Sequence, residues 1–468
     1  MTRILAIDQG TTNTKAILVD ETGAILARAS APLTTEYPHP GWAEQSAQAI
    51  WASVQKVIAD LAPHGRPDGI AIANQRETLV VWDRKTGTPL CPAPIWQCRR
   101  TAEASAWLIA DGHDAKVIAA TGLGINPLFP AGKLAWVLEN IPEAKPLLSQ
   151  GRLCAGTVDA WLLFNLTGAF ATDHSNASRT QLFDTRSLTF SDDLAALFGA
   201  STACLPEPRP SDSRFGQTPE GIPVLAMMGD SHAALYGHGV RAPGTVKATY
   251  GTGSSLMTLT PGRVASSHGL SGTIAWTGRH GTAHALEGNI TVSAQAVSFM
   301  GGILGLGSAA EVSTLAETVP DTGGVVFVPA LAGLGAPHWD DQARGTITGM
   351  THGTTRAHLA RAAIEAVAHQ IADVFAAMEA DGGRLEGLRA DGGASGNGFL
   401  MQRQADFLAR PVTQSAVEEV GALGAAAMAF THFGVTLPLG GEGQTFSPAR
   451  DPGPDRALWA GALRKARA

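Results

Sequence analysis

Residues 4–20 read Ile4-Leu-Ala-Ile-Asp8-Gln-Gly-Thr-Thr-Asn-Thr-Lys15-Ala-Ile-Leu-Val-Asp20, and this stretch decides the fold of the chain. Two apolar runs flank the polar segment at residues 8–15, which predicts a buried β-hairpin. The turn combines a glycine, hydroxyls, a carboxylate and a lysine, groups that bind phosphate oxygens or a metal ion. We interpret it as a phosphate-binding turn; a plain hairpin with a hydrophilic turn has the same pattern.

A second hairpin of the same kind is predicted in the other half of the chain. Residues 245–249 and 256–259 are strand-like, and Tyr250-Gly-Thr-Gly-Ser-Ser between them repeats the glycine and hydroxyl character of the first turn. A chain of 468 residues is too long for one hydrophobic core. We therefore predict two related lobes that meet at a cleft, with the boundary near Gly239.

Composition excludes several classes of protein. A formal net charge of −7 and the absence of a dense Lys/Arg run argue against a nucleic-acid partner. No apolar segment approaches the ~20 residues that span a bilayer, so no membrane partner is expected. The four cysteines lack C-x-x-C spacing and the N-terminus does not resemble a signal peptide, which together predict reduced thiols and a cytoplasmic location.

Polar residues follow a predicted buried strand at residues 69–73. Arg76 and Glu77 stand just after this strand, where side chains often form a binding site. A surface ion pair between them is the alternative, but neighbours in an extended segment point to opposite sides and do not pair easily. Trp96 precedes a predicted helix at residues 102–110, and it either walls a substrate or belongs to the core.

A carboxylate stands at a second strand end. Residues 222–226 form an apolar strand, and Asp230 lies at the turn into a predicted helix, where it can accept a proton from a substrate hydroxyl. An ordinary helix N-cap is the alternative. Further on, the glycine-rich residues 391–397 contain Gly393 and Asn397, which favour a nucleotide loop or a simple glycine turn.

In this order the motifs resemble the FGGY carbohydrate kinases, and among them the glycerol kinases most. The resemblance covers residues 4 to about 429. Residues 130–140 fit most of the family's N-terminal signature, and residues 345–365 fit the C-terminal one. The matching motifs are Asp8-Gln-Gly-Thr-Thr, Asn74-Gln-Arg-Glu-Thr, Trp96-Gln-Cys-Arg-Arg-Thr, Asn176-Ala-Ser-Arg-Thr, Gly229-Asp and Tyr250-Gly-Thr-Gly.

The resemblance implies an α/β fold of two actin-like ATPase (ribonuclease H-like) domains around a central catalytic cleft. Residues 1–239 would form the acceptor-binding domain and residues 240–468 the nucleotide-binding domain. It also implies ATP and Mg²⁺, a small polyol or sugar as acceptor, and a homodimer or homotetramer. Asp230 would be the catalytic base, and Asp8 would hold Mg²⁺ through water. The implied acceptor contacts are Arg76, Glu77, Trp96 and Asp230; the implied ATP contacts are Thr11, Thr12, Lys15, Gly251, Thr252, Gly393 and Asn397.

Three departures from the glycerol kinase pattern alter the predicted acceptor pocket. Leu128 replaces a tyrosine, Ser231 a glutamine and Ser255 a phenylalanine. Discrimination on a single hydroxyl reaches on the order of 10⁴ when a buried partner is left unsatisfied, so such changes can switch the substrate. The acceptor is then glycerol, a longer polyol such as erythritol or xylitol, or a ketose such as xylulose or ribulose. Lys15 replaces the usual arginine, which keeps the charge but loses the bidentate fork.

A different class of protein on the same fold is a non-catalytic actin-like sugar sensor. Such a protein needs an output module, and the chain starts directly with the first hairpin strand, which leaves no room for an N-terminal helix-turn-helix. Both glycine and threonine turns, Asp8 and Asp230 are present. The sequence therefore favours catalysis.

Overall fold

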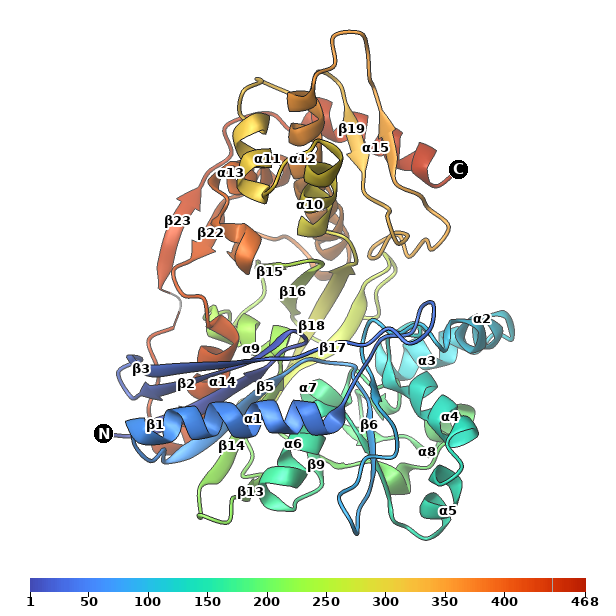
Figure 1. Ribbon diagram of the computed structural model, residues 1–468, viewed down its shortest axis with the longest axis vertical. Coiled ribbons are helices and arrows are strands. Elements are labelled where there is room, and N and C mark those ends of the chain that lie inside the picture. The colour runs from blue at the N-terminus through green and yellow to red at the C-terminus, as the bar shows by residue number, and fades with distance from the viewer. Residues whose placement is uncertain (440) are drawn as a thin grey trace. The chain divides into compact units, whose positions relative to one another are not determined.

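The computed structural model describes residues 1–439 and 441–468, and it confirms both predicted hairpins (Figure 1). Strands β1 (Arg3–Gln9) and β2 (Asn13–Asp20) pair antiparallel, with Asp8 opposite Lys15. Strands β15 (Thr245–Tyr250) and β16 (Ser254–Thr260) pair in the same way.

Contacts between residues divide the chain into two compact units. The first unit contains Met1–Gly239, Gly272–His284 and Glu419–Leu439, and the second contains Val240–Ser271, Ala285–Glu418 and Gly440–Ala468. The sequence did not predict the two later segments of the first unit, because nothing in their composition shows which sheet they pack on. The division into domains 1–239 and 240–468 stays a prediction.

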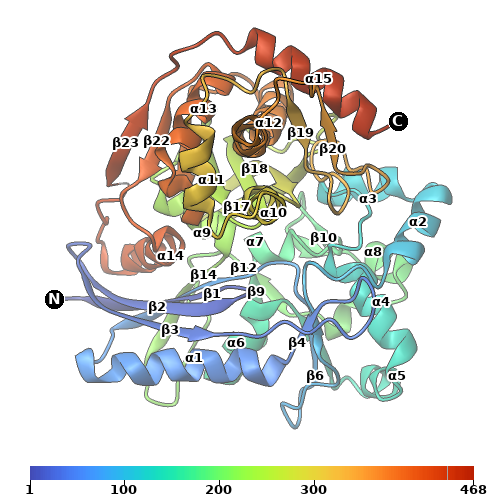
Figure 2. The same cartoon turned by 45° about the horizontal axis from the view of Figure 1, so that its top comes forward.

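The first unit is built on a mixed sheet with the strand order β13-β14-β5-β1-β2-β3. Strands β14, β5 and β1 are parallel, and β2 and β3 continue the sheet antiparallel. Figure 2 shows α1 on one face of this sheet and α14 on the other. The bounds of the remaining elements of this sheet are β3 Ile25–Pro32, β5 Gly69–Asn74, β13 Gly216–Gln217 and β14 Pro223–Gly229.

The sequence of helix α1 (Ala47–Leu61) explains why this segment is helical and packs on the sheet. Ile50, Val54 and Val57 recur at helical spacing and are fully buried against the sheet, and the side chain of Ser46 caps the first turn. The other helices of the first unit are α2 Ala102–Ala110, α3 Asp114–Thr121, α4 Pro130–Asn140, α5 Ala144–Ser149, α6 Val158–Thr167, α7 His174–Ala177, α8 Asp192–Leu197, α9 Asp230–Gly237 and α14 Val420–Phe430.

Short strand pairs complete the first unit. They are β4 Glu44–Gln45 with β7 Ala93–Pro94, β6 Val80–Asp83 with β8 Leu153–Gly156, β9 Ala171–Asp173 with β12 Glu207–Arg209, and β10 Phe183–Asp184 with β11 Thr189–Phe190.

A seven-stranded sheet has the order β17-β18-β16-β15-β21-β22-β23, in which β15, β21 and β22 are parallel. Its strands β16, β15, β21, β22 and β23 belong to the second unit, whereas Gly272–His284, which contains nearly all of β17 and the start of β18, belongs to the first unit. The long helix α12 (Arg356–Gly382) contributes Ile364, Val367 and Ile371 to the core of the second unit. Thr355 begins this helix with a capping box to His358. The other elements are β17 Ser271–Gly278, β18 Gly281–Ile290, α10 Ala294–Ile303, α11 Ala309–Ala316, β19 Val326–Val328, β20 Thr346–Thr348, β21 Gly387–Asp391, α13 Gly398–Leu408, β22 Val412–Ser415, β23 Glu442–Phe446 and α15 Gly453–Ala466.

None of the helices in residues 1–439 and 441–468 combines the length and apolar character that a bilayer crossing requires. The cytoplasmic location stays a prediction of the sequence.

Candidate active site

Three parallel strands of the first unit bring several predicted site residues to one edge of the sheet. In the strand register, Gln9 of β1 lies beside Asn74 of β5, and Asn74 lies beside Gly229 of β14. Asp8, Arg76 and Asp230 are one or two residues from these positions. Carboxyl ends of parallel strands are the usual place for a ligand site in an α/β sheet.

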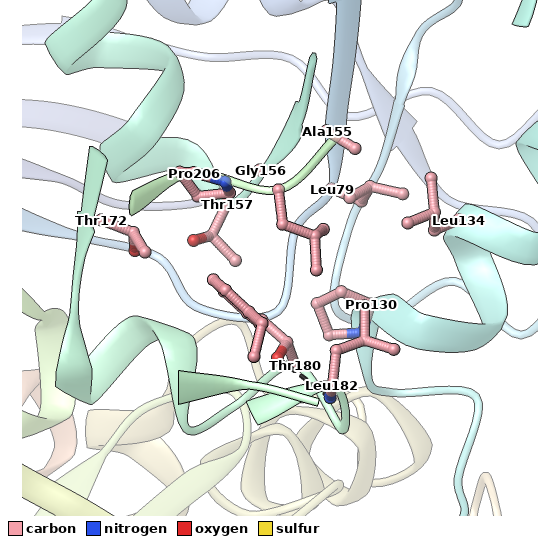
Figure 3. Close-up of a pocket in the computed structure, with 12 residues that line it drawn as sticks. Leu79, Pro130, Leu134, Ala155, Gly156, Thr157, Thr172, Thr180, Leu182 and Pro206 are labelled. Carbon is pink, nitrogen blue, oxygen red and sulfur yellow. Dashed lines mark hydrogen bonds between the residues drawn. The ribbon is translucent and has the colours of Figure 1, made fainter. Parts of the chain in front are cut away.

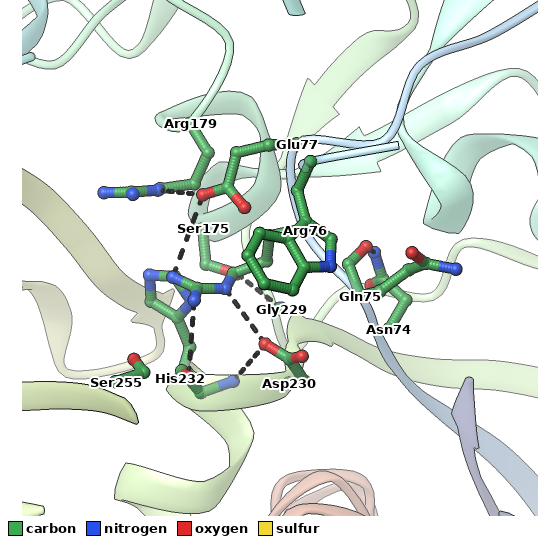
Figure 4. Close-up of polar contacts among 12 residues, drawn as sticks. Asn74, Gln75, Arg76, Glu77, Ser175, Arg179, Gly229, Asp230, His232 and Ser255 are labelled. Atoms are coloured by element: carbon green, nitrogen blue, oxygen red, sulfur yellow. Dashed lines mark hydrogen bonds and ion pairs between the residues drawn. The ribbon is translucent and has the colours of Figure 1, made fainter. Parts of the chain in front are cut away.

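Arg76 holds the predicted base in place. Its Nε donates to Oδ1 of Asp230 at 2.9 Å, and its Nη2 donates to the hydroxyl of Ser231 at 3.3 Å (Figure 4). The backbone N–H of Ser231 donates to the same Oδ1 at 2.6 Å. The Arg76 side chain is 7% exposed, but that of Asp230 is 39% exposed. The carboxylate is therefore oriented on one oxygen and still open to solvent.

Helix α9 begins at Asp230 itself, at the predicted turn from strand to helix. Gly229 is the N-cap, so the alternative in which Asp230 is the N-cap is wrong. A side chain at Gly229 would place its Cβ 2.5 Å from Cδ of Arg76, so the observed position of the Arg76 side chain requires glycine at residue 229.

Glu77 corrects the expectation of an extended segment at residues 76 and 77. Its φ is +59°, in the left-handed region, and this turn brings Oε1 of Glu77 to 3.9 Å from Nη1 of Arg76. The two neighbours thus form a loose ion pair, and both are buried rather than on the surface. Nε of Arg179 donates to Oε1 of Glu77 at 2.7 Å and gives this carboxylate its closest partner (Figure 4).

Lys133 connects Glu77 with Leu128, another predicted acceptor contact. Its Nζ donates to the backbone carbonyl of Glu77 at 2.8 Å and to that of Leu128 at 2.7 Å. The lysine is fully buried, and desolvation lowers its pKa from 10.5 to about 7. Leu128 itself is half-buried in the segment before α4.

The turn of the first hairpin lies against Trp96. The indole N–H of Trp96 donates to the hydroxyl of Thr11 at 2.9 Å, and this hydroxyl donates to Oε1 of Gln75 at 3.4 Å. Trp96 is partly exposed, so it is not the core residue that one alternative suggested. Thr12 and Lys15 are exposed and carry no such side-chain contact to Trp96.

Asp8 lies next to the start of helix α14. It is half-buried, and a Cβ added at Gly421 would come within 3.1 Å of its Oδ2 and 3.7 Å of the Asp230 carbonyl. The Asp8 carboxylate and the main-chain carbonyl of Asp230 therefore both approach Gly421. In the described part of the chain, no three His, Cys, Asp or Glu side chains are grouped to hold a metal ion. Mg²⁺ commonly uses one or two carboxylates together with water and substrate phosphates, and Asp8 fits that donor set.

In the second unit, the predicted ATP contacts lie at the ends of neighbouring parallel strands. Thr249 of β15 is paired with Asp391 of β21, so the turn at Gly251 and the loop at Gly393 follow adjacent strands. Gly392 has φ +86°, and a Cβ there would lie 2.7 Å from the Tyr250 carbonyl, which keeps the loop against the strand end.

Thr252 and Gly393 both offer accessible groups. Thr252 is exposed at the tip of its turn, and Gly393 is exposed with no atom within 4 Å of the place where a Cβ would stand. Asn397 is different, because its Oδ1 caps helix α13 through the N–H of Leu400 at 3.1 Å and its Nδ2 donates to Ser313 at 2.7 Å. The amide of Asn397 thus has a structural task within the second unit.

Ser255 makes a contact that the sequence did not suggest. Its hydroxyl donates to Oε1 of Glu287 at 3.0 Å, and Glu287 is almost fully buried in β18. Ser255, which stands where glycerol kinases have phenylalanine, is therefore hydrogen-bonded to Glu287 within the second unit.

Sequence reasoning also missed the buried polar residues around α7. The side-chain amides of Asn74 and Asn176 exchange two hydrogen bonds of 3.0 Å, which join the end of β5 to α7. The hydroxyl of Ser175 donates to Asp173 and accepts from the N–H of Gly229, each at 3.0 Å. The signal was present in the polar run at residues 176–180, whose composition fits no apolar periodicity.

A cavity elsewhere in the first unit is not a candidate site. Its volume is about 10 Å³, enough for about one water molecule, and it contains none of the predicted site residues (Figure 3). The lining side chains are mostly apolar, among them Leu79, Pro130, Leu134 and Leu182.

Comparison with solved structures places this architecture among two-domain sugar and polyol kinases. Plasmodium falciparum glycerol kinase with ADP matches with a TM-score of 0.94 and 31% identity, covering 100% of this chain and 99% of that one. Xylulose kinase from Lactobacillus acidophilus shares the fold with a TM-score of 0.90 at 20% identity, covering 99% and 98% of the two chains.

The chain belongs to the FGGY family of carbohydrate kinases. Residues 3–237 match the family's N-terminal domain and residues 246–433 its C-terminal domain. Apulose kinase of Pectobacterium atrosepticum is 47% identical over 90% of this chain and 88% of its own length. Glycerol kinase of Citrifermentans bemidjiense is 45% identical over 93% and 91%.

Family membership confirms the fold class and the enzyme class predicted from the motifs. The chain is a phosphotransferase that uses an alcohol group as acceptor, with ATP as the donor and a sugar or polyol as the substrate class. It also favours the enzyme over the sensor.

Proposed function

We propose that this kinase phosphorylates a polyol or ketose larger than glycerol, with Asp230 as the general base. The observation that carries the proposal is the geometry of Asp230. Arg76 and the Ser231 N–H both bind Oδ1, which leaves Oδ2 to accept the proton of an acceptor hydroxyl. General-base assistance contributes roughly 10² to 10⁴ in rate.

The acceptor binds along Arg76, Glu77 and Trp96 in this proposal. The Arg76 guanidinium and the Glu77 carboxylate offer donors and acceptors to neighbouring hydroxyls, while the indole of Trp96 covers an apolar face of the carbon chain. Residues 1–239 thus act as the acceptor-binding domain.

Both hairpin turns carry groups that suit ATP phosphates. Thr11, Thr12 and Lys15 of the first turn, and Gly251 and Thr252 of the second, supply N–H groups, hydroxyls and a cation, which suit the charge on a transferring phosphoryl group. The loop containing Gly393 and Asn397 belongs to the same nucleotide-binding domain, residues 240–468. Asp8 would hold Mg²⁺ through water, and the ion would neutralise charge on the phosphates when bound.

Leu128, Ser231 and Ser255 favour an acceptor larger than glycerol. Each is smaller than the tyrosine, glutamine or phenylalanine of glycerol kinases, and Ser255 brings a hydroxyl that is already paired with Glu287. A hydroxyl in place of an aromatic wall favours a ligand with an additional polar group. A relative whose name specifies apulose supports a substrate other than glycerol.

A coupled assay of ADP release with MgATP tests the proposal. The panel contains glycerol, erythritol, xylitol, ribitol, D-xylulose, D-ribulose, L-ribulose and apulose. We expect the highest kcat/KM for a member longer than glycerol, and we expect Ser255→Phe to move the ratio toward glycerol. A clear preference of the wild type for glycerol would refute the proposal that the acceptor is larger than glycerol. The absence of turnover with every compound of the panel would show that the acceptor is none of them.

Asp230→Asn tests the base. We expect kcat to fall at least 10²-fold with an unchanged melting temperature, because the amide keeps an oxygen for Arg76 but does not accept a proton. Retention of more than about a tenth of the wild-type kcat would refute the role. Asp212→Asn in the same unit is the matched control.

The homodimer or homotetramer implied by the resemblance is part of the proposal too. Light scattering on the eluting protein distinguishes these states from a monomer.

A further inference from the structure

The buried ammonium of Lys133 joins two segments that are far apart in the sequence. Its Nζ lies 2.8 Å from the carbonyl oxygen of Glu77 and 2.7 Å from that of Leu128. Lys133 stands in the first turn of α4, a helix that begins with Pro130 and is buried through Leu134 and Val137. One rigid helix therefore fixes both backbones.

The backbone at Glu77 needs such support. A non-glycine residue in the left-handed region is strained, and the conformation persists only when its surroundings hold it. Lys133 binds the carbonyl of Glu77, and Arg179 binds its carboxylate at 2.7 Å. Lys133 thus holds the main chain of Glu77, and Arg179 orients its side chain.

The number of donors agrees with this geometry. Burial lowers the pKa of Lys133 to about 7, and a neutral amine has two N–H groups, one for each carbonyl. The protonated form has a third and is attracted to the Glu77 carboxylate. Both forms satisfy the two carbonyls.

We propose that Lys133 is a positioning residue for acceptor binding, which holds Glu77 and Leu128 at the distance that the acceptor requires. The inference rests on the proposed contacts of Glu77 and Leu128 with the acceptor. Lys133 does not touch the acceptor, so its loss acts on acceptor affinity through these two residues and leaves the ATP-binding residues of the second unit unchanged.

The alternative is a purely structural lysine that stabilises the packing of α4. The two roles differ in what they change. A structural residue alters the melting temperature and affects the KM values for both substrates alike, whereas a positioning residue raises the acceptor KM selectively.

Lys133→Met removes the donors and keeps most of the side-chain volume. With the panel acceptor that gives the highest kcat/KM, we expect the acceptor KM to rise at least tenfold and the ATP KM to stay within twofold. Val137→Ala is the matched control, because Val137 is equally buried on the same helix and donates to neither carbonyl. It should lower the melting temperature without changing the acceptor KM.

A double-mutant cycle with Glu77→Gln identifies the route. If Lys133 acts through Glu77, Lys133→Met raises the acceptor KM by a smaller factor in the Glu77→Gln background than in the wild type. An unchanged acceptor KM in folded Lys133→Met, or equal changes in both KM values, would overturn the inference. An unchanged acceptor KM in Glu77→Gln would instead refute the proposed site. If Lys133→Met does not fold, Lys133→Gln, which keeps two N–H donors on a shorter side chain, is measured in the same way.

Discussion

The two hairpins β1–β2 and β15–β16 have the same pairing but are held at their turns in different ways. In the first, side chains and main chain both hold the turn, because the hydroxyl of Thr11 is bound by Trp96 and Gln75 and the carbonyl of Thr12 accepts from the N–H of Leu33 at 2.8 Å. In the second, main-chain groups fix it, because the carbonyls of Gly251 and Thr252 accept hydrogen bonds from the N–H groups at the start of α10.

The difference separates the chemistry available at the two turns. The Thr11 hydroxyl is shared with the residues proposed for the acceptor, whereas the Thr252 side chain is exposed and its backbone is fixed. A turn held by its backbone tolerates side-chain changes and not a loss of glycine. The first turn depends on the Thr11 side chain in addition to its main-chain hydrogen bonds.

Glycine replacement tests this contrast most strongly. A Cβ at Gly253 would lie 2.5 Å from the carbonyl oxygen of Ile290, whereas a Cβ at Gly10 would lie 3.0 Å from that of Asn13 in its own turn. We expect Gly253→Ala to destabilise the protein by about 3 kcal/mol and Gly10→Ala by about 1 kcal/mol, as overpacking against main chain requires. Denaturant unfolding of both variants checks the order; equal losses would contradict the contrast.

The pH dependence of stability tests a buried carboxyl group in the unit that carries the first hairpin. Burial, and next the charge of Asp173, raise the pKa of Asp159 in the first unit to about 6. The folded protein then holds a proton that the unfolded chain releases between pH ~4 and ~6, so this group's contribution to stability falls as pH rises through that window.

Asp159→Asn removes this dependence. We expect the stability of the wild type relative to the variant to fall by about 2 kcal/mol between pH 4 and pH 7, following the conversion of pKa shift to free energy. Hydrogen exchange measured on peptides from β1–β2 should report the effect. A difference between wild type and variant that is the same at both pH values would count against it.

Hydroxyl removal gives the smallest effects. Thr11→Val leaves the Trp96 indole N–H without its acceptor, at a cost of about 1 kcal/mol, and should raise both the acceptor KM, through Trp96, and the ATP KM, through the lost hydroxyl. Thr252→Val changes an exposed side chain, so we expect less than about 0.5 kcal/mol in stability and a change in the ATP KM alone. Thermal melts and KM values for both substrates distinguish the two variants. A larger loss of stability in Thr252→Val than in Thr11→Val would contradict the expected order.

Local patterns in the sequence predicted most of the fold. Apolar runs around a polar turn predicted both hairpins, because burial of one face depends on neighbours in sequence. The predicted helix at residues 102–110 matches α2 at both ends. Motif order supplied the family and the residues at the strand ends.

Other features were out of reach for a physical reason. Glu77 has a left-handed backbone although it is not glycine, and only its partners Lys133 and Arg179 explain it. Those partners lie 56 and 102 residues away in the chain. No local pattern encodes such convergence, and the same holds for the packing of α14 on the first unit.

Helix α14 has a consequence for protein synthesis. It packs on α9, β5 and β1, and Gly424 approaches the carbonyl of Ala233 so closely that no side chain fits. Yet α9 ends at Gly237 and α14 begins at Val420. A ribosome that adds about 5–20 residues per second needs about 10–40 s to span this gap. During that time the helix that carries Asp230 has no cover on this side, so chaperones that bind nascent chains have a defined target and a defined interval in which to act.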